Sequence, residues 1–112
     1  MRFLFLAFDD PQAAGALTDE QRREYAAAFR DYAQLLHDRG AYVDGAGLED
    51  PGTATVVRVD GGMVTDGPYA EATEQLGAFF HVECADLDEA LALARKMPVA
   101  TDVRVEIRPT FE

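Results

Sequence analysis

The spacing of hydrophobic positions changes along this chain, and each spacing predicts one type of element. The segment Arg2–Phe8 is almost wholly apolar, which predicts a strand covered on both faces and therefore central in a sheet. Over Thr18–Arg39, apolar residues recur at steps of three and four, which predicts a helix with one apolar stripe. Gln21 stands three residues after Thr18, as in a capping box, and Gly40 is placed to end the helix.

The middle of the chain changes to a period of two residues and is punctuated by Gly, Asp and Pro. A short strand begins at residues 42–43. The segments Ala54–Val59 and Met63–Thr65 form the arms of a hairpin that turns at residues 60–62. One or two helical turns are expected over residues 69–75.

A second strong strand covers Leu76–Cys84, and its side chains alternate between two faces. One face carries Phe80, Val82 and Cys84, and the other carries Phe79, His81 and Glu83. Asp86 and Glu89 form a second capping box, which opens a helix that stops before Pro98. The last strand, Val103–Ile107, points its apolar residues inward. Its outward residues are Arg104, Glu106 and Arg108.

This order of elements is a split βαβ pattern with an inserted hairpin. It predicts an α+β fold with two helices on one face of a largely antiparallel sheet. The other face is then uncovered in a single chain, and it mixes apolar with charged side chains. Its predicted members include Phe79, His81, Glu83, Arg104 and Glu106. Such a face needs a partner or a ligand, so we expect a homodimer that joins face to face around a ligand cleft.

Composition narrows the class of protein. The 112 residues are enough for one domain, residues 1–112, with a hydrophobic core that needs no disulfide or bound metal to be stable. A formal net charge of −11 argues against nucleic acid and anionic membranes as partners, and no apolar run is long enough to span a bilayer. A single cysteine, Cys84, forms no internal disulfide and fits a reducing cytoplasm; we expect it to pack as a small hydrophobe.

His81 and Glu83 are the first candidates for chemistry. They are two residues apart on a strand, so both side chains leave the same face, where a carboxylate can orient an imidazole as a general base. The structural alternative, a solvated or cross-strand-paired histidine, is favoured. With Glu106 they make only a weak set of metal ligands, so neither metal nor cofactor is expected. His37, near the end of the first helix, suits the helix dipole.

Asp66-Gly67-Pro68-Tyr69 is the most specific short string in the chain. In structural terms, Asp66 bonds to backbone N–H groups and holds a turn. In functional terms, it is an acid or base at the edge of a cleft, beside the Tyr69 phenol. On the residues alone, the structural interpretation is favoured.

The same string carries a family resemblance. Together with Glu74–Phe80, Ala85–Ala90, Val105–Pro109 and Gly45–Leu48, the segment Thr65–Glu71 resembles the YCII-related family, in its DGPF-type branch. Tyr69 stands where that branch has phenylalanine, and His81 stands where an aliphatic residue is usual. The resemblance covers nearly the whole chain.

The resemblance implies a ferredoxin-like βαββαβ fold that dimerises into an α/β barrel. Some relatives resemble small enzymes that act on chlorinated aromatic breakdown products, and others are associated with sigma factors. The founding branch has a proposed His–Asp pair, but neither His37 nor His81 falls in the matching motif, so Asp66 is the residue that carries over.

Two hypotheses follow. The first is a homodimeric enzyme that performs elimination or isomerisation on a small organic molecule, with Asp66 and His81 as catalytic residues. Its predicted substrate-binding residues are Tyr69, Phe79, Glu83 and Arg104. The second is a non-catalytic dimer that binds a small ligand or a regulatory protein.

Overall fold

A computed structural model describes residues 1–111; Glu112, the last residue of the predicted domain, lies outside the described part. In chain order the elements are β1 (Arg2–Asp9), α1 (Pro11–Gly15), α2 (Asp19–Asp38), β2 (Tyr42–Gly47), the 3-10 helix η1 (Pro51–Thr53), β3 (Thr55–Val57), β4 (Val64–Asp66), β5 (Gln75–Glu83), α3 (Leu87–Ala94) and β6 (Arg104–Pro109). No helix among these residues is both long and apolar enough to cross a membrane.

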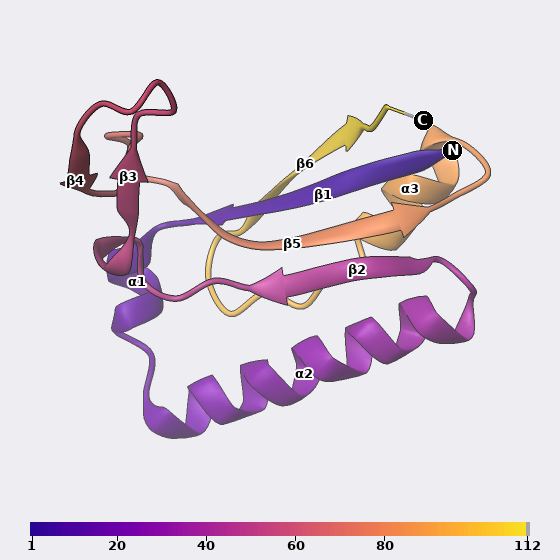
Figure 1. Cartoon of the computed structure of the whole chain (residues 1–112). Coiled ribbons are helices and arrows are strands. Elements are labelled where there is room, and N and C mark those ends of the chain that lie inside the picture. The colour runs from indigo at the N-terminus through magenta and orange to yellow at the C-terminus, as the bar shows by residue number, and fades with distance from the viewer. Residues whose placement is uncertain (112) are drawn as a thin grey trace.

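The main sheet has four strands in the order β2-β5-β1-β6, and every neighbouring pair is antiparallel. With α2 between β1 and β2 and α3 between β5 and β6, this is the ferredoxin-like βαββαβ fold that the sequence predicts. The predicted central place of β1 is confirmed. The hairpin β3–β4 forms a separate small sheet that stands off one end of the main sheet, on the side away from α2 (Figure 1).

Helices α2 and α3 cover the same face of the sheet. The strands bury alternate side chains against them: Phe3, Phe5, Ala7, Ala78, Phe80 and Val82. From α2 come Tyr32 and Leu36, and from α3 come Ala90 and Leu93. The Tyr32 hydroxyl donates a buried hydrogen bond of 2.8 Å to the Leu93 carbonyl, which ties the two helices together. The buried position predicted for Cys84 is confirmed.

The opposite face of the sheet, here called the open face, has no helix over it. Strand register places Leu4 between His81 and Arg108, and Leu6 between Phe79 and Glu106. Apolar side chains lie mainly on the inner strands, and charged ones lie on the edge strand β6, at the start of β1 and at the end of β5. The strand-paired positions of the open face are Arg2, Leu4, Leu6, Phe8, Asp44, Ala46, Phe79, His81, Glu83, Arg104, Glu106 and Arg108.

Two short helices were not predicted from the sequence. Asp10 caps α1 and Asp50 caps η1, each by accepting a hydrogen bond from the backbone N–H two residues later. Each cap is followed by a proline, Pro11 or Pro51, at the first helical position. An Asp-Pro pair is a signal for a turn and equally for a helix start, and the sequence does not separate the two.

The helical turns expected over residues 69–75 are absent, and that prediction is wrong. This segment consists of bends and open chain before β5 begins. The Gln75 side-chain amide bridges the carbonyls of Ala70 and Ala72, at 2.9 and 2.8 Å, and so holds the segment in an irregular path. The predicted hairpin is confirmed, with Gly61 at φ +85° in its turn.

Candidate functional site

The residues that the sequence singled out lie at opposite ends of β5. Asp66 ends β4, and Tyr69 follows it with 86% of its surface exposed, so both belong to the hairpin beside the start of β5 (Figure 1). His81 lies near the end of β5, on the open face. Within one chain, Asp66 and Tyr69 therefore do not share a site with His81.

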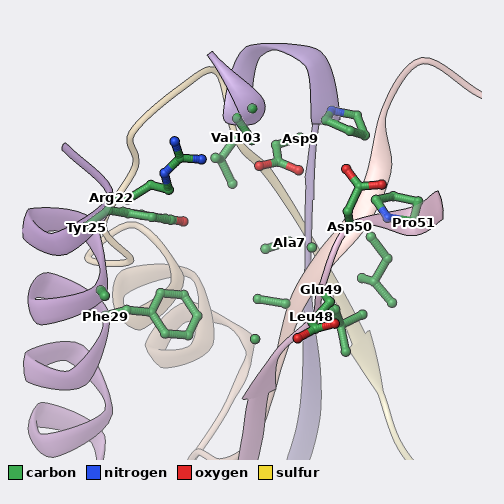
Figure 2. Close-up of a pocket in the computed structure, with 18 residues that line it drawn as sticks. Ala7, Asp9, Arg22, Tyr25, Phe29, Leu48, Glu49, Asp50, Pro51 and Val103 are labelled. Atoms are coloured by element: carbon green, nitrogen blue, oxygen red, sulfur yellow. The ribbon is translucent and has the colours of Figure 1, made fainter. Parts of the chain in front are cut away.

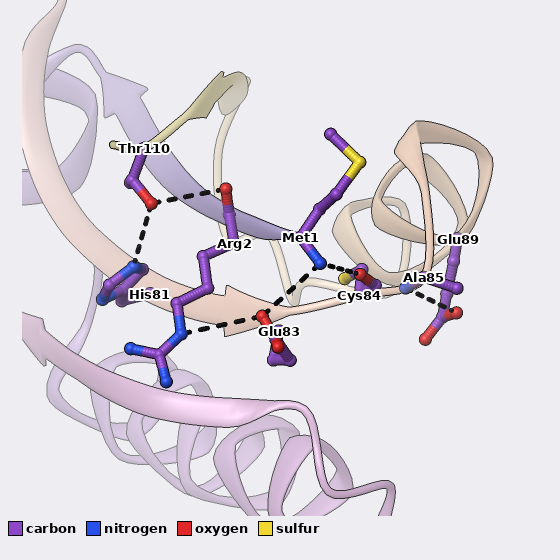
Figure 3. A network of polar contacts seen from close by, with 8 residues as sticks. All are labelled: Met1, Arg2, His81, Glu83, Cys84, Ala85, Glu89 and Thr110. Atoms are coloured by element: carbon purple, nitrogen blue, oxygen red, sulfur yellow. Dashed lines mark hydrogen bonds and ion pairs between the residues drawn. The ribbon is translucent and has the colours of Figure 1, made fainter. Parts of the chain in front are cut away.

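Figure 3 shows the surroundings of His81 and Glu83. His81 Nε2 lies 3.5 Å from Thr110 Oγ1. Glu83 Oε2 lies 3.7 Å from the Met1 amine and 3.6 Å from Arg2 Nε. Glu83 is thus occupied by two cations rather than by the imidazole. This geometry favours the structural interpretation of His81 as a residue paired across strands.

The remaining predicted binding residues are also spread over the open face. Phe79 is paired with Leu6, and Arg104 is paired with Phe8. The Arg104 guanidinium is largely exposed and lies 3.8 Å from the Asp102 carboxylate. None of these side chains lines either of the two cavities described below. Among residues 1–111, no three His, Cys, Asp or Glu side chains gather closely enough to hold a metal ion.

A different site lies on the helix-covered face, where β1 ends. Along β1 the inward positions are Phe3, Phe5 and Ala7, and the next position in this series is Asp9. The carboxyl of Asp9 therefore points to the interior side. The register of β5 shifts beside it, and a Cβ built on Gly77 would lie 3.1 Å from Asp9 Oδ1. A glycine at this irregularity leaves room for the carboxyl.

Helix α2 forms the facing wall of the site. Its capping box at Thr18 fixes where the helix starts, and steps of three and four then put Arg22, Tyr25 and Phe29 on one face. The Phe29 ring packs on the buried Phe80 ring, with centroids 5.0 Å apart. Tyr25 packs edge-on against Phe29, with centroids 5.9 Å apart. This aromatic row anchors the wall to the core.

The segment that follows β2 closes the third side. The Leu48 backbone N–H donates a 2.8 Å hydrogen bond to the Gly77 carbonyl, which holds this segment against β5. Glu49, Asp50 and Pro51 then line the opening. Because Asp50 Oδ1 already caps η1 by accepting from Gly52 at 2.8 Å, its carboxylate has a structural role.

These walls enclose a cavity of about 450 Å³, here called the Asp9 cavity (Figure 2). Its lining is mainly apolar, from residues such as Ala7, Phe29, Leu48, Leu76 and Val103. Among the described residues that line the cavity, Arg22 is the one with a positively charged side chain. A largely apolar hollow with a few convergent polar groups is the usual form of a small-molecule site.

The electrostatics of the cavity single out Asp9. Burial raises the pKa of the Asp9 carboxyl above its ordinary 3.8, and the neighbouring Asp10 charge adds to the rise; its own backbone N–H acts against both. Burial also raises the pKa of the Tyr25 phenol, with the Asp9 charge as the second cause. Among residues 1–111, no other side chain donates a hydrogen bond to the Asp9 carboxyl. A carboxyl of raised pKa, free of structural partners, is suited to proton transfer.

Sequence reasoning missed this site, although a signal was present. In Asp9-Asp10-Pro11, Asp10 is sufficient to cap the following helix. Asp9 continues the alternation of an apolar strand into an inward position, where a carboxyl without a partner costs free energy, so its presence there is a signal of function. Likewise, Tyr25 puts a phenol into the apolar stripe of α2.

With the geometry in place, comparison with known proteins defines the class. The family model described as "YCII-related domain" matches residues 1–112. The chain therefore belongs to the YCII-related family. It is also 32% identical, over 117 aligned residues, to an uncharacterised protein of Rhizobium meliloti (strain 1021). That alignment covers 97% of this chain and 91% of the relative. Membership of the DGPF-type branch stays a prediction.

Proposed function

We propose that this protein is a small acid–base enzyme that isomerises or eliminates from a small oxo acid held in the Asp9 cavity. One observation carries the proposal: a carboxyl of raised pKa lines a largely apolar cavity, with a phenol and a guanidinium on the facing helix. The proposal moves the catalytic site from the open face to the helix-covered face, and it keeps the reaction class expected from the sequence.

The three polar side chains suit three different roles. Arg22 binds the carboxylate of the ligand, because a guanidinium pairs with a carboxylate through two parallel hydrogen bonds. The Tyr25 hydroxyl donates a hydrogen bond to the ketone oxygen of the ligand, where negative charge develops. Asp9 removes a proton from the carbon beside that ketone.

The electrons balance in both reaction classes. When Asp9 takes the proton, the C–H bonding pair forms a carbon–carbon double bond and the ketone pair moves to the oxygen. In an isomerisation, the oxo acid carries a C=C bond conjugated with the enolate; the ketone re-forms, the C=C bond shifts, and Asp9 returns the proton to the far carbon of the conjugated system. In an elimination, a leaving group on the next carbon departs with its bonding pair as the ketone re-forms. The raised pKa of Asp9 favours these roles, because a more basic carboxylate removes a proton more readily.

Deuterium exchange tests the proposal without knowledge of the natural substrate. The protein is incubated in D₂O with a panel of small oxo acids, and deuterium uptake beside the ketone is followed by NMR. We expect Asp9→Asn to slow protein-dependent exchange by about 100-fold or more, which is the usual range for loss of a general base. Tyr25→Phe should slow it by a smaller factor.

Two matched variants make the test specific. Asp66→Asn and His81→Gln remove the groups that the sequence put forward, and both lie outside the Asp9 cavity. We expect both to exchange at the wild-type rate. If these variants lose exchange while Asp9→Asn keeps it, the catalytic site is not the Asp9 cavity. If oxo acids raise Tm but none exchanges, the protein is a binder and the enzymatic proposal is wrong.

We also propose that two copies pair through their open faces. Leu4, Leu6, Phe8 and Phe79 remain partly exposed there in one chain. A compact chain of 12.3 kDa exposes about 6,100 Å² by the usual scaling, whereas this chain exposes 7705 Å². The excess of about 1,600 Å² is roughly twice the 800 Å² per partner that a stable interface buries, so it leaves room for such an interface. Two open sheets paired in this way would form the α/β barrel that the resemblance implies.

A further inference from the structure

A second hollow adjoins the Asp9 cavity on the helix-covered side of β6. It has a volume of about 270 Å³ and lies between α3 and β6; we call it the α3–β6 groove. Its apolar lining residues are Leu91, Met97, Val99, Val103, Val105 and Ile107, joined by Ala94. Val103 lines both hollows, so the two lie on either side of this residue.

The groove exists because α3 is short. The helix stops at Ala94 after eight residues, and the chain then loops back to β6. Apolar side chains at its rim stay in contact with water: Leu91 is 39% exposed and Val99 is 61% exposed. Arg95 is the charged residue among the described residues that line the groove. An apolar groove next to a cavity that holds a few polar groups fits a ligand with a polar head and an apolar tail.

We propose that the α3–β6 groove binds an alkyl tail of the ligand whose acid group is held at Arg22, so that the substrate class is a medium-chain oxo acid. This inference rests on the function proposed for the Asp9 cavity. The inward residues Val103, Val105 and Ile107 follow one another from the position before β6 into that strand, over about 13 Å of extended chain. Such an elongated apolar path favours a flexible alkyl chain over a compact ring.

The test uses unreactive fatty acids as probes, each kept below its micelle concentration. Kd is measured by isothermal titration calorimetry for butanoate, hexanoate, octanoate and decanoate. Burial of a methylene group contributes enough free energy to lower Kd by about threefold to fourfold. We therefore expect Kd to fall by about that factor for each methylene added beyond hexanoate. A Kd that does not change with chain length would overturn the inference.

Two valine variants locate the tail. Val99→Asp puts a carboxylate at the groove, and Val99 is exposed, so the fold tolerates the change. We expect this variant to bind butanoate with the wild-type Kd, but to bind octanoate and decanoate no more tightly than the shorter acids. Val59→Asp is the matched control, because Val59 is 98% exposed in the hairpin turn, outside both hollows. If Val59→Asp removes the dependence of Kd on chain length to the same extent, the alkyl tails bind elsewhere and the inference is wrong.

Failure of this inference is distinguishable from failure of the proposed function. If decanoate binds tightly in wild type and Asp9→Asn alike but no oxo acid exchanges deuterium, the tail site in the groove is supported and the enzyme proposal is wrong. If Asp9-dependent exchange is observed but chain length does not affect Kd, the enzyme proposal is supported and the tail site is wrong. If all the fatty-acid carboxylates bind at Arg22, Arg22→Gln raises the Kd of every acid by one common factor. A rise in Kd confined to the long acids would contradict the proposed orientation.

Discussion

At the scale of single residues, Asp9 lowers stability at neutral pH at the position where we propose a catalytic base. Its carboxyl stands in the inward series of β1 and is partly desolvated, so its pKa is raised in the folded state. A raised pKa means that the folded state holds the proton more tightly than the unfolded chain does. Stability from this group is complete below pH 3.8 and is lost as the pH rises through the folded-state pKa.

Asp9→Asn should therefore stabilise the protein at neutral pH. The amide carries no charge to desolvate, so we expect a higher Tm than wild type at pH 7 and a difference that shrinks towards pH 3. Thermal unfolding at several pH values measures this. Asp66→Asn, at an exposed position, should shift Tm little at any pH. A difference that grows towards low pH would contradict the assignment of Asp9.

Gly45 shows a second residue-scale constraint, which is purely structural. A Cβ at this position of β2 would lie 2.5 Å from Cδ1 of the buried Phe80 ring and 3.1 Å from the Phe79 carbonyl oxygen. We expect Gly45→Ala to lower the free energy of unfolding by about 1–3 kcal/mol, as overpacking does. Urea denaturation measures it. Gly47→Ala is the control, since no atom lies within 4 Å of its Cβ, and an equal loss there would refute the steric cause.

At the scale of elements, the start of α2 positions the wall of the Asp9 cavity. Thr18 Oγ1 accepts from the Gln21 N–H at 3.1 Å, and the Gln21 side chain accepts from the Thr18 N–H at 2.9 Å. Arg22 and Tyr25 follow within two turns. The capping box therefore acts on both the stability of the helix and the placement of two site residues.

Thr18→Ala should cost about 1 kcal/mol of unfolding free energy, because one N-terminal backbone N–H loses its side-chain acceptor. Denaturant unfolding measures the loss, and Thr18→Ser should recover most of it. We expect fraying of the first turn of α2 to weaken the binding of butanoate as well, because Arg22 lies just after that turn. If Thr18→Ser is as destabilised as Thr18→Ala, the capping interpretation is wrong.

At the scale of the whole molecule, the exposed surface exceeds that of a compact chain, and the open face is the proposed interface. Leu6 lies on an inner strand of that face, between Phe79 and Glu106. Leu6→Glu puts a charge in the middle of the proposed apolar contact, where its desolvation opposes pairing. We expect the dimer dissociation constant to rise by about 100-fold or more, as measured by sedimentation velocity.

The control for this prediction is Leu87→Glu. Leu87 is also exposed, at 51%, but it stands in the first turn of α3, where a negative charge is favourable. This variant should assemble as the wild type does. A wild-type chain that sediments as a monomer, or a Leu6→Glu chain that stays dimeric, would overturn pairing through the open face.

Much of the fold was predictable because its signals are local. The apolar run of β1, the capping boxes at Thr18 and Asp86, and the alternation of β5 each express a backbone preference within a few residues. The irregular segment at residues 69–75 was not predictable in the same way. Its path depends on the Gln75 side chain reaching back to two carbonyls, which a periodic pattern does not encode.

By itself, the sequence determined the main strands, the helices α2 and α3, their order and the membership of a family, because periodicity and caps act over short distances. It also placed His81 and Glu83 on one face of a strand. Only the tertiary structure decided that Glu83 pairs with Met1 and Arg2, and that Asp9 meets Tyr25 and Arg22 in a cavity. Such neighbours come from β1, α2 and the segment after β2, and their meeting depends on how whole elements pack.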